Sequence, residues 1–161
     1  MPVYMQYETI TGDVTEEKHK GWVDVDSFSL GVSRAINTPV GSTAKREVGS
    51  PNVSGIQISK KLDVSSYRWL EESLYGQKAV KCTVNFLRTG TDGNLDVYAT
   101  YIFTNCLVAS YSVGGGGDGA SESISIDFTK LEFSYVPREG ENVASTTKPR
   151  AAFDLTTAKK A

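Results

Sequence analysis

Hydrophobic and polar residues alternate with a period of two along most of this chain, which is the pattern of β-strands with unequal faces. The longest such stretch runs from Cys106 to Pro137, where a glycine-rich segment, Gly114–Gly119, separates two alternating runs. In the second run the alternation changes phase at Thr129-Lys130, so a bulge is expected to bend the strand there. A long bent strand paired with its neighbour predicts the closing hairpin of an antiparallel barrel.

The same alternation predicts further strands before this hairpin. Their expected bounds are Val3–Ile10, Trp22–Val32, Val53–Lys60, Val80–Leu87 and Leu95–Thr104. The second of them also changes phase, because its apolar residues are odd-numbered up to Val25 and even-numbered from Phe28. Two long strands that each change faces favour a strongly coiled sheet or a barrel corner.

One stretch, residues 63–76, has helical rather than strand periodicity. Its apolar positions follow the spacing of one helix face: Tyr67, Leu70 and Leu74. Asp63 or Ser65 is suited to cap the N-terminus, and Gly76 suits the left-handed position after the last turn. We expect this helix to lie against the sheet and to bury its apolar stripe there.

Two stretches lack periodicity. Residues 33–52 contain two prolines and two glycines and show neither strand nor helix periodicity, which predicts an extended loop of the kind that often binds a partner. Residues 137–161 are polar and are expected to be irregular, apart from a weak segment at 151–156. The 161 residues suit a single domain. The predicted fold is mainly β: an antiparallel barrel or two-sheet sandwich with one flanking α-helix.

Composition narrows the possible partners. A hydrophobic content of 39% and a charged content of 22% are typical of a globular protein. The net charge of −2 and the scattered Lys and Arg residues give no basic face for nucleic acid. No apolar run approaches the ~20 residues that span a bilayer, so no membrane insertion is expected. The N-terminal segment lacks the basic and apolar regions of a signal peptide, which predicts synthesis in the cytoplasm and export, if any, by another route.

No motif in the sequence meets all the requirements of a known catalytic, nucleotide-binding or metal-binding site. Gly114–Gly119 matches a nucleotide-binding pattern but leads into a strand, and Asp92–Asp96 lacks the later glycine and glutamate of a calcium loop. His19, the one histidine, lies in a charged segment that predicts a solvated turn. Asp24 and Asp26 share a strand face without visible activating neighbours. We therefore predict no catalytic residues, no cofactor, no metal site and no enzymatic activity.

The two cysteines, Cys82 and Cys106, lie in apolar strands and are interpreted as buried free thiols.

Six segments together resemble one known family in their order and spacing. They are the strand from Val3, HKGWVDVDSFSLG at 19–31, IQISK at 56–60 leading into Asp63, residues 81–88, VASYSVGGGG at 108–117, and ESISIDFTKLEFSYVP at 122–137. Phe153-Asp154-Leu155 is similar to the family's aromatic-Asp-aliphatic ending. The chain resembles the haemolysin-coregulated protein (Hcp) family, the tube subunits of bacterial type VI secretion systems.

This resemblance implies a hexameric ring that stacks into a tube and works with sheath, spike and small effector proteins. It implies secretion to the medium or a target cell by the type VI route. In the family a serine after an aromatic residue on the second strand faces the lumen, and Ser29 matches it; Ser27 and Ser33 share its strand face. We expect ring-to-ring contacts from the loop, with these residues: Pro39, Val40, Gly41, Lys45, Arg46 and Val48.

Two alternatives stay open. The first is a standalone β-barrel module that binds a ligand such as a carbohydrate on Tyr98, Tyr101 and Tyr111. The second is a tail-tube protein of a phage-derived particle.

Overall fold

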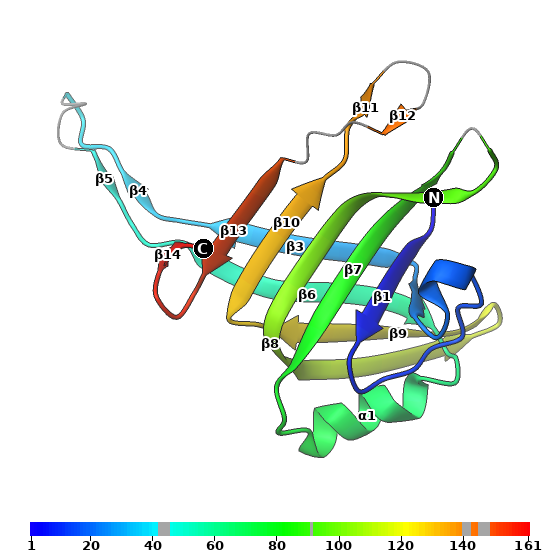
Figure 1. The fold of residues 1–161 in the computed structure, drawn as a ribbon. Helices are drawn as coiled ribbons and strands as arrows, with labels where there is room; N and C mark the ends of the chain where they lie inside the picture. Colours follow the sequence, from blue (N-terminus) through cyan, green and yellow to red (C-terminus); the bar gives the residue numbers. More distant parts are fainter. Residues whose placement is uncertain (42–45, 91, 140–142, 145–148) are drawn as a thin grey trace.

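The chain folds into two antiparallel β-sheets that share one long strand, with an α-helix on one flank (Figure 1). The computed structural model describes residues 1–41, 46–90, 92–139, 143–144 and 149–161. The predicted mainly-β fold with a flanking helix is confirmed in its two-sheet form. The barrel is not, because the sheets formed by the described strands do not close on each other.

The large sheet has the strand order β14-β13-β10-β8-β7-β1-β2. Its strands are β1 (Val3–Tyr7), β2 (Val23–Val25), β7 (Val80–Thr89), β8 (Leu95–Gly116), β10 (Lys130–Tyr135), β13 (Arg150–Asp154) and β14 (Lys159–Lys160). The small sheet has the order β3-β6-β9-β8. Its other strands are β3 (Ser27–Ser33), β6 (Asn52–Lys61) and β9 (Gly119–Asp127).

Strand β8 joins the two sheets because it pairs with different neighbours along its length. Its first part pairs with β7 and β10, and from Leu107 onward it pairs with β9. The sequence predicted a break between two strands at Asn105. The chain instead continues through Asn105 with a positive φ of 56°, a local kink that an asparagine tolerates better than most residues.

Both predicted phase changes mark places where the chain passes from one sheet to the other. Asp26 separates β2 of the large sheet from β3 of the small sheet, and Phe128-Thr129 separates β9 from β10. Apolar residues on both sides of each crossing must point to the same core, so the odd–even pattern reverses there. The reversal therefore reports a change of sheet, not the bulge at a barrel corner that the pattern suggested.

The helix, α1 (Ser66–Tyr75), packs by a different face from the predicted one. Trp69 is fully buried, its ring centre 5.0 Å from that of Tyr7. The expected buried residues are exposed instead: Tyr67 by 63%, Leu70 by 44% and Leu74 by 70%. Spacing alone identified an apolar stripe but not which side of the helix meets the sheet.

Both ends of α1 also differ from the prediction. Ser65 occupies the N-cap without a side-chain capping bond, and Asp63 accepts hydrogen bonds from the Ser65 N–H and hydroxyl. Gly76 has φ −65°, so it is extended rather than left-handed. Glycine is required there for space, because a Cβ would lie 2.6 Å from the Glu72 carbonyl oxygen.

The segment predicted as an irregular loop contains a β-hairpin that projects from the body, called the arm below (Figure 1). Its strands are β4 (Ile36–Asn37) and β5 (Glu47–Val48), paired Ile36 to Val48 and Asn37 to Glu47. The predicted irregular C-terminal segment is likewise partly ordered into strands. Besides β13 and β14, it contains β11 (Arg138–Glu139) and β12 (Val143–Ala144).

The core lies between the two sheets and extends under α1. Its members are fully or almost fully buried apolar side chains, with Met5, Tyr7, Val23, Ile56, Trp69, Val84, Phe103, Ile124 and Ile126 at 0% exposure. Cys82 and Cys106 are buried free thiols, as predicted. The hydrogen bond with Cys106 and, to a smaller extent, burial raise the pKa of the Cys82 thiol.

Candidate functional site: a serine face and a projecting arm

The outward side of the small sheet is lined by serines in two cross-strand rows. One row joins Ser27, Ser59, Ser123 and Ser112, and the other joins Ser29, Gln57, Ser125 and Ser110. We call this surface, together with Ser33, the serine face. It arises because the apolar residues of each strand point to the core and leave every second, polar residue outside.

The serine face is uncharged over its central area. Among the described outward positions of these four strands, charge is confined to Lys61 and Asp127 at opposite ends. The Ser27 and Ser59 hydroxyl oxygens lie 2.6 Å apart, and the Gln57 amide donates to Ser125 at 2.8 Å. Hydroxyls that both donate and accept make such a surface adaptable to many polar partners without a strong preference for charge.

The structure brings the three predicted serines together on this face. Ser27, Ser29 and Ser33 are exposed on one side of β3. Sequence reasoning missed the other members: Gln57, Ser59, Ser110, Ser112, Ser123 and Ser125. Their signal was present, since Ser or Gln occupies every second position in the stretches QIS at 57–59, SYS at 110–112 and SIS at 123–125. Which strands lie side by side could not be read from that recurrence.

The arm carries the residues predicted to stack rings. Val40 is fully exposed, Val48 is 53% exposed, Arg46 is exposed and Pro39 is half-buried. Gly41 has a positive φ of 84°, a conformation that glycine adopts without strain. Lys45 lies outside the described residues. A hairpin with exposed apolar side chains that projects into solvent is suited to contact another molecule.

An acidic pocket lies near the junction of β2 and β3. Its cavity of ≈ 220 Å³ is lined by Asp13, Asp24, Asp26 and Asp63 together with Lys61 and Leu62. Partial burial, then the charge of Asp26, raises the pKa of the Asp24 carboxyl. No group of three potential ligands that could hold a metal ion occurs among the residues that the structure describes. The pocket thus combines carboxylates that disfavour ionisation of Asp24 with Lys61, which favours it.

His19 was predicted in a solvated turn, and this prediction is wrong. The ring is 3% exposed, with Nδ1 2.5 Å from a Glu16 carboxylate oxygen and Nε2 3.0 Å from the Asn85 amide nitrogen. The hydrogen bond to His19 lowers the pKa of Glu16. Trp22 packs edge-on against the ring, 4.7 Å between centres. His19 therefore holds the short helix η1 (Glu17–His19) onto the large sheet.

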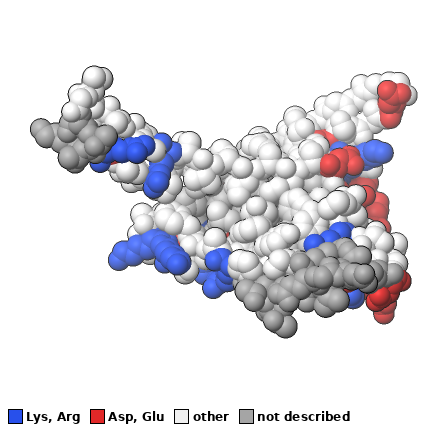
Figure 2. Space-filling view, turned by 90° about the horizontal axis from the view of Figure 1, so that it is seen from above, with Lys and Arg blue, Asp and Glu red and all other residues white. Residues whose placement is uncertain are grey.

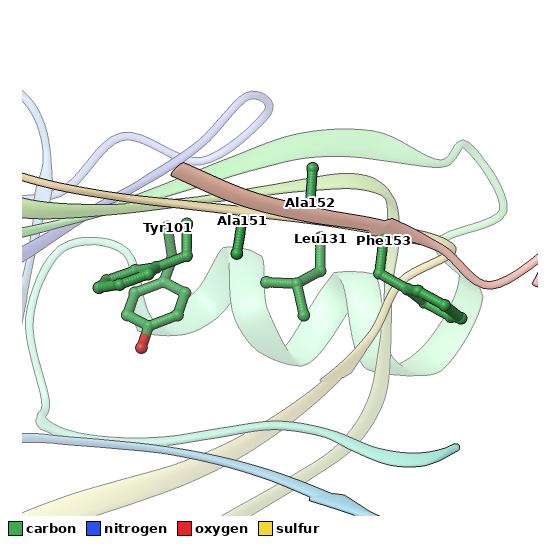
Figure 3. A pocket seen from close by; sticks show the side chains of 6 residues that line it. Tyr101, Leu131, Ala151, Ala152 and Phe153 are labelled. Atoms are coloured by element: carbon green, nitrogen blue, oxygen red, sulfur yellow. The ribbon is translucent and has the colours of Figure 1, made fainter. Parts of the chain in front are cut away.

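An apolar groove lies on the core-facing side of the large sheet near its β13 edge (Figure 3). Its cavity is ≈ 200 Å³, lined by Tyr101, Leu131, Phe133, Ala151, Ala152 and Phe153. Tyr101, Leu131 and Phe153 point to one side of β13, whereas Ala152 points away. We call this site the apolar groove.

The three tyrosines of the carbohydrate alternative do not form one platform. Tyr98 lies near Arg88 and Tyr135, Tyr101 contributes to the apolar groove, and Tyr111 belongs to the core margin near Glu122. Tyr98 and Tyr101 both pack against Phe86, but Tyr111 lies in the part of β8 that pairs with β9, so the three do not form the predicted platform.

Charge is unevenly distributed in the view from above (Figure 2). Lys and Arg gather at the end with the arm, and Asp and Glu gather at the opposite end. None of the described helices is both long and apolar enough to cross a membrane.

Two antiparallel sheets that share β8, a projecting β-hairpin and one flanking helix make this a mainly-β protein. The family model described as "Type VI secretion system effector, Hcp" matches residues 4–135. The chain belongs to the Hcp family of type VI secretion systems.

Solved structures share this fold over nearly the whole chain. A type six secretion system protein aligns with a TM-score of 0.89 and 24% identity, covering 99% of both chains. Hcp1 from Salmonella typhimurium aligns with a TM-score of 0.78 and 18% identity, covering 99% of this chain and 98% of its own. A type VI secretion system effector from Yersinia pestis aligns with a TM-score of 0.71 and 18% identity, covering 94% of this chain and 98% of its own. No curated protein matches the chain.

Proposed function

We propose that this chain is the repeating subunit of a type VI secretion inner tube. Copies form a hexameric ring, rings stack inside a sheath beneath a spike, and the tube leaves the cell by the type VI route with small effectors inside it. Family membership supports this proposal, and the observation that carries it is the serine face: a broad, uncharged, hydroxyl-lined sheet surface on a protein with exposed edges. The role is structural, without a cofactor, nucleic acid or membrane insertion.

The serine face is our candidate for the lumen wall. A channel through which different proteins pass must hold them weakly, and strong charge would select some and retain others. Neutral hydroxyls form hydrogen bonds that exchange readily with water, so their net contribution is small. Ser29 lies on the edge strand β3, at the end of the row that continues through Gln57 and Ser125.

The arm is our candidate for the ring-to-ring contact. Its exposed apolar residues gain little by packing on their own chain, because the arm projects from the body (Figure 1). Deletion of residues 39–51 is expected to leave folded rings but to abolish stacking and secretion. Tubes of normal length from this deletion would show that the arm has another role.

Ser29→Gln tests the lumen assignment. The longer side chain should narrow and reshape the serine face without disturbing the core, so ring formation persists while the cellular level of a lumen-held effector falls. Effector and subunit levels are measured by immunoblotting in cells and medium. Ser134→Gln, on the outward side of the large sheet, is the matched control. Equal effector levels in both variants would make Ser29 an ordinary surface serine.

A further inference from the structure

Helix α1 presents an apolar stripe to solvent. Tyr67, Leu70, Leu74 and Tyr75 are exposed by 63%, 44%, 70% and 65%. The spacing of three and four residues places Tyr67, Leu70 and Leu74 along one side of the helix, and Tyr75 borders that side in the last turn. A flanking helix usually turns its most apolar side to the sheet, but α1 turns only Trp69 fully inward. The remaining apolar side chains need another surface to cover them.

The stripe is held rigidly in this orientation. The Trp69 indole donates to the Ser65 hydroxyl at 3.2 Å, and Ser65 in turn bonds to Asp63. Asp63 receives a hydrogen bond from the buried Lys60 ammonium group at 2.9 Å. These contacts fix the rotation of α1 about its axis, so the helix cannot turn its stripe inward without breaking a buried charged network.

The apolar groove is concave where the α1 stripe is convex, and both surfaces are lined by apolar side chains. Its volume of ≈ 200 Å³ accommodates one or two large side chains, and its lining is dominated by Leu131, Phe133 and Phe153. Within one chain α1 packs against β8, and it lies away from the β13 edge where the groove opens (Figure 1). The stripe and the groove therefore cannot cover each other in a single copy.

Charge distinguishes between two possible occupants of the groove. Lys160 pairs with Phe153 across β13 and β14, so a cation lies on the groove's border. α1 carries two anions, Glu71 and Glu72, and one cation, Arg68, which pairs with Glu71 at 2.7 Å. The described part of the arm and its base carry two cations, Arg34 and Arg46, and one anion, Glu47. The net negative charge of α1 favours it beside the cationic border of the groove, and the net positive charge of the arm disfavours the arm.

We propose that the α1 stripe of one copy docks into the apolar groove of the next copy. Two different patches on one chain give a head-to-tail contact, which closes into a ring when the rotation per copy is suitable. The inference rests on the proposed function, because it names the surfaces by which neighbouring subunits of the ring meet. Leu74 is the most exposed stripe residue and therefore the expected anchor.

Cross-linking between two variants, each with one added cysteine, tests the contact. One preparation carries Leu74→Cys and the other carries Ala151→Cys; the native Cys82 and Cys106 are fully buried and should not react. Mixed and treated with a short bis-maleimide, the two should give covalent heterodimers, and neither should do so alone. A chain with both substitutions should give a ladder of covalent oligomers. Val113→Cys, 56% exposed on β8, replaces Leu74→Cys as the control and should give none with Ala151→Cys.

Leu74→Glu supplies the second measurement. The residue is exposed, so circular dichroism should show a native fold, while association weakens by roughly 100-fold, as for an interface anchor. Wild-type rings without heterodimers, and rings that persist in Leu74→Glu, would overturn this inference but leave the proposed function intact. Wild-type protein that forms no rings at any concentration would instead overturn the proposed function.

Discussion

The ammonium group of Lys60 is fully buried between two carboxylates. Its Nζ lies 2.9 Å from Asp63 and 3.2 Å from Glu122, and it also donates to the Lys61 carbonyl at 2.8 Å. Glu122 is fully buried as well. Removing one partner of such a pair leaves a desolvated charge without compensation, whereas removing both does not.

Lys60→Met is therefore expected to lower the free energy of unfolding by about 3–5 kcal/mol. The double variant Lys60→Met/Glu122→Leu should recover most of that loss. Denaturant unfolding followed by tryptophan fluorescence measures both, because Trp69 lies in the same network. A loss below about 1 kcal/mol in the single variant would mean that water reaches the pair.

The surroundings of Asp24 make the stability of the folded state depend on pH, and they determine the sign of that dependence. Burial and the charge of Asp26 raise its pKa above the usual 3.8, so the folded state holds the proton more tightly than the unfolded state. Stability from this group is present at low pH and is lost as the pH rises through the folded pKa. Asp24→Asn should thus be more stable than the wild type at pH 7 and indistinguishable from it near pH 3.

The gain should be small, less than about 1 kcal/mol, because the side chain is largely in contact with solvent. Urea unfolding across this pH range measures it. Asp118→Asn, in the turn between β8 and β9, removes the same charge elsewhere and should show no such gain. An equal gain at pH 3 and pH 7 would contradict the electrostatic explanation.

At the scale of elements, α1 shows what periodicity can and cannot predict. The spacing of Tyr67, Leu70 and Leu74 correctly predicted a helix. It did not predict the buried face, because Trp69 brings more apolar area than any of them and a hydrogen bond to Ser65 that holds its indole in place. Which face is buried depends on the sheet that receives it, and that information lies far away in the sequence.

Trp69→Ala should accordingly lower the free energy of unfolding by about 3–5 kcal/mol, while Leu74→Ala should change it by less than about 1 kcal/mol. Thermal or denaturant unfolding of dilute protein compares the two, at a concentration where copies stay apart. Similar losses of unfolding free energy from both substitutions would mean that Leu74 is buried against the sheet, which contradicts the exposed stripe.

The strands were predictable for a different reason. Each alternation in the sequence corresponds to a strand. Both predicted phase reversals, the one before Phe28 and the one at Thr129-Lys130, lie where the chain changes sheet. Whether a reversal means a bulge or a change of sheet depends on pairing between distant segments. The same limit applied to the serine face, where β3 supplied three visible serines and the partners on β6, β8 and β9 required the register.

At the scale of the whole molecule, one chain offers several uncovered surfaces at once. The serine face is polar and flat, the arm projects beyond the body, and the α1 stripe and the apolar groove lie on separate elements. A monomer would leave all of them in water. A closed ring would place the serine face on the inside and cover the apolar pair between neighbours, leaving the arm free for the next ring.

Cryo-electron microscopy of the purified, concentrated wild-type protein tests this account most directly. It should show closed six-membered rings whose channel is lined by the small sheet, with Ser27, Ser29 and Ser33 facing inward. Particles that remain single 17.4 kDa chains at high concentration, or rings that turn the small sheet outward, would contradict it.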